Sequence, residues 1–229
     1  MTDLMDQPST PPIQFQYLGD SVGFSDAYAL QLERRAEVAA GRACPTVFLL
    51  EHRPVITLGR NASLDHLRQP RSALEVIGIE VVDTDRGGDV TYHGPGQLVA
   101  YPILDLHHWR LSIRWYLRTL EAVLIDQIAA YGLVGTRVEG LTGVWVGPGK
   151  VAAIGVGLRH WVTFHGIALN VTPNFDHFDQ IVPCGISDRP VTSLGRLLPS
   201  PPSMKQVAED FTRSFRYHFD KQPGDYAVQ

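Results

Sequence analysis

The first candidate for chemistry in this chain is a cysteine flanked by residues that favour loops. Cys184 lies between Pro183 and Gly185, where the backbone can expose a thiol. A thiolate is a strong nucleophile, and a nearby cation, histidine or helix N-terminus favours its formation. Most free cysteines are simply small buried apolar residues. That alternative stays open for Cys184, and it is the better interpretation of Cys44, beside Pro45 at the start of an apolar run.

The strongest candidate partner for such a thiol is Lys150, the only lysine between residues 1 and 204. It opens the apolar run 151–155, where a solvated lysine has little reason to lie. A partly desolvated lysine loses its proton more easily and can act as a base. The alternative is a charge that protects the edge of a strand from aggregation.

A glycine-rich run and a shorter polar segment predict the wall of a binding site. Residues 86–97 hold four glycines and a proline, and such a run can bring backbone N–H groups close to a ligand. The side chains of Arg86, Thr91, His93 and Gln97 favour a site over an ordinary turn. The dipeptide at 165–166, polar inside an apolar run, predicts either a bulge or the wall of a pocket.

Several common motifs are missing from the sequence. The run ending in Lys150 is no phosphate-binding P-loop, because Val144 and Val151 stand where glycine and serine or threonine are required. The histidines, including His107 and His108, lack the spacing of metal ligands, and the two cysteines form no CxxC pair. We therefore expect neither a metal nor a nucleotide cofactor.

The composition predicts one globular domain. The chain has 229 residues, of which 44% are hydrophobic, and a net charge of −4. We expect a disordered leader over 1–12, a catalytic domain over 13–220 and a tail over 221–229. The 20 basic against 24 acidic residues argue against nucleic-acid binding. The polar N-terminus and the lack of an 18-residue apolar stretch predict a cytoplasmic protein without a membrane anchor.

Hydrophobic periodicity predicts interspersed strands and helices. Strands are expected over 13–18, 46–51, 55–58, 79–82, 98–104, 143–146, 150–158 and 161–171. Helices are expected between Ser25 and Gly41, over 113–131 and from Ser203 onward, and residues 59–74 read as a mobile loop. Because no regular βαβ period appears, we predict an α+β fold with a mixed sheet flanked by helices.

Four blocks of residues, in order, resemble the signature of the lipoyl(octanoyl) transferases. They are residues 86–97 with Tyr101, residues 150–155, residues 165–170 and residues 183–186. The resemblance implies a fold shared with biotin and lipoate protein ligases. It also implies transfer of an octanoyl or lipoyl group from acyl carrier protein to a lysine ε-amine. The implied acceptors are the lipoyl-carrier domains of 2-oxo-acid dehydrogenase complexes and the glycine-cleavage H protein.

The resemblance also implies roles for particular residues. Cys184 would form the acyl thioester, and Lys150 would lower the pKa of that thiol and relay protons. The acyl and thioester pocket would be lined by Arg86, Gly87, Gly88, Asp89, Val90, Thr91, Tyr92, His93, Ala153, Ile154, Gly155, Gly166, Ile167 and Ala168. Supporting roles would fall to Gln97, Tyr101, His165 and Asn170, while the roles of His93 and His165 stay open.

Four alternatives remain from the sequence. An ATP-dependent lipoate or biotin ligase shares the fold but needs no nucleophilic thiol. The other three are an amidotransferase that moves the group between carrier proteins, a thiol-dependent hydrolase and a non-catalytic binding module. The stretch 53–71, with four arginines against Asp65, is interpreted either as a docking patch for an acidic carrier protein or as a solvated loop.

Overall fold

The computed structural model describes residues 10–182 and 189–220, so Cys184 and both predicted terminal segments lie wholly or mostly outside the described residues. The strands are β1 (Gln14–Val22), β2 (Thr46–His52), β3 (Val55–Leu58), β4 (Glu80–Asp83), β5 (Val90–His93), β6 (Gln97–Ile103), β7 (Gly135–Thr136), β8 (Gly143–Val146), β9 (Gly149–Arg159) and β10 (Val162–Asn170). The helices are α1 (Phe24–Ala39), α2 (Arg71–Val76), α3 (Ile113–Ala129), α4 (Phe175–Phe178), α5 (Leu194–Leu197) and α6 (Met204–Phe219), with short 3₁₀ turns at Leu64–His66 and Leu106–His108.

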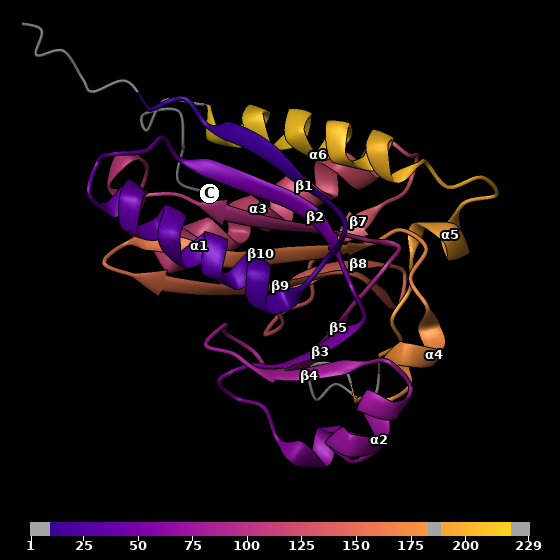
Figure 1. Ribbon diagram of the computed structural model, residues 1–229. Helices are drawn as coiled ribbons and strands as arrows, with labels where there is room; N and C mark the ends of the chain where they lie inside the picture. Colours follow the sequence, from indigo (N-terminus) through magenta and orange to yellow (C-terminus); the bar gives the residue numbers. More distant parts are fainter. Residues whose placement is uncertain (1–9, 183–188, 221–229) are drawn as a thin grey trace, which may run out of the picture.

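A seven-stranded mixed sheet is the centre of the fold, in the order β1-β2-β6-β10-β9-β8-β7. Strands β1 and β2 pair in parallel and the other neighbours pair antiparallel. Side chains alternate between its faces, so Val47 and Leu49 pack with α3 and α6 while Phe48 and Leu50 pack with α1. Figure 1 shows these helices on opposite faces of the sheet. This architecture confirms the α+β prediction.

Helix α6 buries the apolar stripe that its sequence predicts. Val207, Phe211, Phe215 and Phe219 are fully buried, and the Ser203 hydroxyl accepts the Gln206 backbone N–H at the start of the helix. The rings of Phe215 and Phe219 stack with centroids 4.2 Å apart. Aromatic burial on this scale fixes α6 against the sheet and α3.

A second sheet of three strands, β4-β3-β5, forms a separate layer. Figure 1 shows it with α2 as a lobe below the large sheet. The predicted strands 46–51 and 55–58 are both present, but they lie in different sheets, because the chain leaves the large sheet after β2. The prediction of a loop over 59–74 is wrong at its end, where α2 begins at Arg71.

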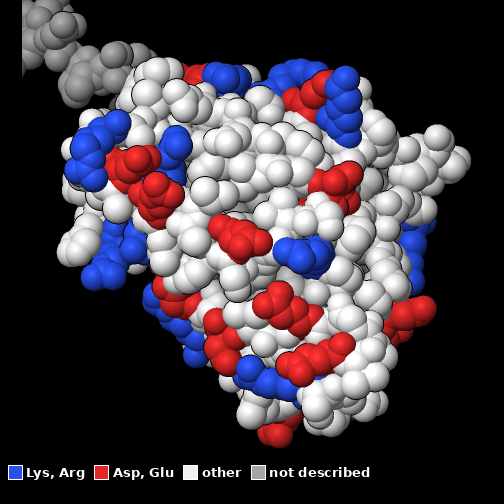
Figure 2. Space-filling model, in the orientation of Figure 1, with Lys and Arg blue, Asp and Glu red and all other residues white. Residues whose placement is uncertain are grey.

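Charged side chains of both signs are interspersed on the face shown in Figure 2. The mixture agrees with the small net charge. In residues 10–182 and 189–220, none of the helices combines the length and apolar character needed to cross a bilayer.

Replacing Phe215 with alanine tests the α6 contact. Phe215 is 0% exposed and also meets Phe15 edge-on at 5.7 Å, so Phe215→Ala should lower the free energy of unfolding by about 3–5 kcal/mol. Tyr217, on the same helix and 61% exposed, is the matched control, and Tyr217→Ala should change it by roughly 0.5 kcal/mol or less. Urea denaturation measures both values, and equal effects would contradict this packing.

Candidate active site

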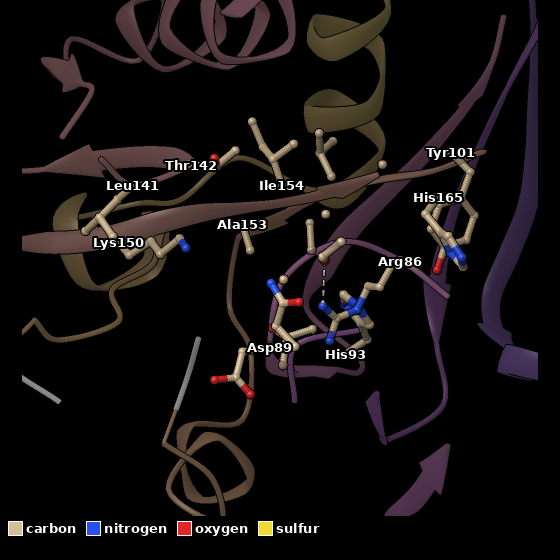
Figure 3. Close-up of a pocket in the computed structure, with 18 of the residues that line it drawn as sticks. Arg86, Asp89, His93, Tyr101, Leu141, Thr142, Lys150, Ala153, Ile154 and His165 are labelled. Atoms are coloured by element: carbon tan, nitrogen blue, oxygen red, sulfur yellow. Dashed lines mark hydrogen bonds between the residues drawn. The ribbon is translucent and has the colours of Figure 1, made fainter. Parts of the chain in front are cut away.

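A pocket of about 470 Å³ lies where the small sheet meets the α1 face of the large sheet. Its walls come from the run 86–89, from β5 and β6, and from the facing strands β9 and β10 (Figure 3). Strand pairing places Gly155 opposite Gly166 and Ala153 opposite Ala168, so the floor consists of small residues. Three of the four sequence blocks predicted to form one site therefore lie together, and the fourth, residues 183–186, falls outside the described residues.

Arg86 fixes the glycine-rich run between the two sheets. Its guanidinium donates to the hydroxyl of Thr57 (2.9 Å) and to the carbonyl of Thr57 (2.6 Å) in β3. The next residue, Gly87, donates its N–H to the Val156 carbonyl of β9 at 2.9 Å. A Cβ atom on Gly155 would lie 2.8 Å from the Gly87 carbonyl oxygen, so glycine is required where the run crosses β9.

The histidines at the site are uncharged at neutral pH. Burial lowers the pKa of His165 to about 4, although Asp85 at 2.8 Å opposes this shift. Burial, and then the neighbouring His52 and Arg86, hold the pKa of His93 well below its usual range. Neutral imidazoles supply hydrogen bonds to the pocket but no positive charge. Among its described lining residues, the other nitrogen bases are the side chains of Lys150 and Arg86.

His52 is a buried histidine that supports the pocket from behind. It donates from Nδ1 to the Val22 carbonyl at 2.9 Å, and its Nε2 accepts the Tyr101 hydroxyl at 2.7 Å. Burial lowers the pKa of His52 to about 4. The neutral imidazole thus holds Tyr101, whose ring lines the pocket.

Lys150 lies at one end of the pocket, at the start of β9. The residue is 9% exposed, and its ammonium is 5.1 Å from the centroid of the Trp145 ring. Its backbone N–H donates to Pro190 (2.8 Å), and its carbonyl accepts from Thr192 (2.9 Å). The chain that follows the segment 183–188 is therefore bound directly to Lys150.

The chain that precedes the segment 183–188 is bound to His66, which contacts Asp89. Val182 donates its N–H to the His66 carbonyl at 2.8 Å. The His66 side chain in turn lies 2.6 Å from the carboxylate of Asp89, which lines the pocket. Both described flanks of the Cys184 segment are thus attached to residues at the pocket or to their direct partners.

Most residues that the sequence assigned to the site line the pocket. They are Arg86, Gly87, Gly88, Asp89, Thr91, His93, Tyr101, Lys150, Ala153, Ile154, Gly155, His165, Gly166, Ile167 and Ala168. Gln97 and Asn170 lie behind it and are joined by a 2.9 Å hydrogen bond. Gln97 also accepts from His93 at 3.3 Å, so the pair supports the wall.

Val90 and Tyr92 do not line the pocket, which corrects their assignment to it. Successive side chains of a strand point to opposite faces, so β5 directs Thr91 and His93 toward the pocket. Val90 and Tyr92 instead pack in the core of the small sheet, where the Tyr92 hydroxyl lies 2.9 Å from Nδ1 of His177. Their contribution is to hold β5 in place.

Several lining residues were not identified from the sequence. They are Phe24, Asn61, Gly140, Leu141 and Thr142. None of them belongs to a motif, and only the tertiary fold brings them to the pocket. Among the described side chains, no cluster of three or more histidine, cysteine, aspartate or glutamate residues could hold a metal ion.

The stretch 53–71 is not a uniform basic patch. Arg53 lies 3.5 Å from Asp26, and Arg71 lies 2.8 Å from Asp83. Arg60 and Arg68 are exposed, and neither has an acidic partner within the described part of the chain. Any docking role therefore rests on these two arginines.

Comparison with known proteins identifies the family. Residues 24–216 match the model of the lipoyl protein ligase A/B catalytic domain. The octanoyltransferase of Solibacter usitatus is 50% identical over 197 residues, which cover 84% of this chain and 89% of that protein. The octanoyltransferase of Gloeobacter violaceus is 50% identical over 187 residues, 81% of each chain. The chain belongs to the octanoyltransferase family. It is therefore an acyltransferase.

Solved structures confirm the predicted fold. A putative lipoate protein ligase from T. acidophilum with bound lipoic acid has a TM-score of 0.69 at 14% identity, covering 90% of this chain and 86% of that chain. A biotin protein ligase from Aquifex aeolicus has a TM-score of 0.53 at 13% identity, covering 94% and 74%. The resemblance to both ligase folds is confirmed at the level of architecture.

Replacing His52 tests whether the imidazole behind the pocket is neutral. Its pKa of about 4 lies below the ordinary 6.5, so the unfolded chain binds more protons between these values and stability falls as pH falls through this window. Between about pH 7 and about pH 5, the free energy of unfolding of the wild type should fall by about 2 kcal/mol more than that of His52→Asn.

The control is His160→Asn, which removes an exposed histidine from a turn with φ +49°, a conformation that asparagine tolerates. Urea titrations at both pH values provide the measurement. The same pH dependence in the wild type and in His52→Asn would show that this imidazole is not held neutral.

Proposed function

We propose that the protein transfers an octanoyl or lipoyl group from acyl carrier protein to a lysine ε-amine of lipoyl-carrier domains, the first step of endogenous protein lipoylation. The acyl group is held meanwhile as a thioester on Cys184. The observation that carries the proposal is Lys150 at the end of the pocket, with its backbone bonded to the chain that follows the Cys184 segment. The octanoyltransferases that share half of its aligned residues support the choice of acyl group.

In the first step, Lys150 in its neutral amine form accepts the proton of the Cys184 thiol. The thiolate sulfur attacks the thioester carbonyl of the donor, a new C–S bond forms, and the bond to the pantetheine sulfur breaks. The departing thiolate takes the proton from Lys150. A thioester donor already carries the energy for acyl transfer, so the step needs no nucleotide.

In the second step, the ε-amine of the acceptor lysine attacks the Cys184 thioester. A C–N bond forms, the C–S bond breaks, and the proton lost by the amine passes through Lys150 to the cysteine sulfur. The enzyme returns to its starting state. Backbone N–H groups of the glycine-rich run are the proposed donors to the developing oxyanions.

The other pocket residues select and hold the acyl chain. Phe24, Ala153 and Ala168 offer apolar surface to an alkyl group, and burial of each methylene contributes about 0.8 kcal/mol. His93 and His165, being neutral, shape the wall and orient polar groups without competing with Lys150 for the thiolate.

Intact mass after incubation with octanoyl-acyl carrier protein, without ATP or acceptor, tests the mechanism. The wild type and Cys44→Ser should gain a hydroxylamine-labile octanoyl adduct, and Cys184→Ser should lose it or form an oxygen ester. Lys150→Ala should form the adduct about 10²–10⁴-fold more slowly, the usual contribution of a general acid–base group. No wild-type adduct, with acceptor modification only when ATP is added, would indicate a ligase instead.

Charge reversal of Arg60 and Arg68 tests docking of the acidic carrier protein. The double change to glutamate should raise KM for the carrier several-fold, with little change in kcat, and the effect should shrink at high salt. Arg42→Glu with Lys205→Glu is the control, since it changes the charge equally at two exposed sites outside this stretch. Equal KM values for the two double variants would exclude this docking site.

A further inference from the structure

A buried carboxylate on α3 has no role in the transfer steps above. Glu121 has a side chain only 2% exposed. Its Oε2 accepts from Arg118 at 2.7 Å and from Arg137 at 2.9 Å, and its Oε1 accepts the Gly143 backbone N–H at 3.4 Å. A buried ion pair is weak evidence for stability, since its desolvation cost offsets the attraction. The buried ion pair of Glu121 can instead serve to fix one arrangement of the chain.

Two of the three partners of Glu121, Arg137 and Gly143, lie at the two ends of one loop. Arg137 follows β7, Gly143 begins β8, and the residues between them form the connection. Leu141 and Thr142 in this connection line the pocket, and Figure 3 shows both beside Lys150. A single carboxylate thus holds both ends of the loop that borders this lysine.

The end of the loop at Gly143 is in direct contact with the lysine side chain. A Cβ atom on Gly143 would lie 2.7 Å from Cε and 3.4 Å from Nζ of Lys150. The Lys150 side chain therefore packs on the backbone of Gly143, which has a φ of +138°. The backbone on which the lysine packs is therefore the same backbone whose N–H donates to Glu121.

We propose that Glu121 is a positioning residue for Lys150, acting through the loop 137–143. It does not touch the substrate. It fixes the backbone on which the lysine packs and the Leu141–Thr142 wall beside it, so that the ammonium group faces the pocket at a constant position. The inference rests on the proposed function of Lys150 and adds to it a residue that belongs to none of the four sequence blocks.

Two arginines provide a matched test. Arg118 and Arg137 donate to the same oxygen, and their side chains are 45% and 41% exposed, but only Arg137 belongs to the loop. Arg137→Ala should slow single-turnover acylation of the enzyme on the order of tenfold, because small displacements of a reacting group are costly. Its KM for octanoyl-acyl carrier protein should stay within about twofold, since the acyl wall is retained.

In Arg118→Ala, acylation should slow by less than about twofold, although the loss of one ion pair to Glu121 lowers the melting temperature as in Arg137→Ala. Arg137→Lys, which keeps the cation, should recover part of the rate. Equal acylation rates in the two alanine variants, or a change in KM alone, would overturn the inference. Should Arg137→Ala fail to fold, Glu121→Gln is the second variant, and it should show the same loss of rate at unchanged KM.

The same assay separates this inference from the proposed function. If Lys150→Ala acylates at the wild-type rate, the proposed role of the lysine fails, and that of Glu121 fails with it. If Lys150→Ala is slow but Arg137→Ala matches Arg118→Ala, only the role of Glu121 fails.

Discussion

The pocket depends on the close passage of the glycine-rich run between two sheets. The chain at 86–88 crosses β9 at a distance that Gly155 allows and that a Cβ atom would prevent. The guanidinium of Arg86 then bonds the run to Thr57 of the small sheet. Because interiors are packed without gaps, this contact determines the width of the pocket as well as the docking of the small sheet.

The two faces of the large sheet differ in the size of their apolar cores, and only one of them borders the pocket. The face under α3 and α6 carries the larger apolar core, with stacked aromatic rings. The face under α1 has a smaller core and leaves the middle of β9 and of β10 open to the pocket. Stability is therefore concentrated away from the site, and this allows buried histidines and a buried lysine on the other side.

Burial also affects the charge states of the side chains at the site. Burial keeps His52, His93 and His165 uncharged at neutral pH. Lys150 and Glu121 are buried as well, yet each has specific contacts, with the Trp145 ring and with two arginines. Buried groups with such contacts have fixed positions, which is what the proposed role of Lys150 requires.

The sequence by itself determined the elements and most of the pocket. Hydrophobic periodicity located α3, α6 and every strand of the large sheet except the two-residue β7, because burial of one face imposes a period on the chain. The glycine-rich run, Lys150 and the dipeptide 165–166 were identified because their residue types are unusual for a turn or an apolar strand, and the resemblance to the lipoyl(octanoyl) transferases added the other lining residues. Tertiary structure alone decided which sheet received β3, which side chains of β5 faced the pocket, and that Leu141, Thr142 and Glu121 belong to the environment of Lys150. These features depend on contacts between residues far apart in the chain, and local periodicity carries no information about such contacts.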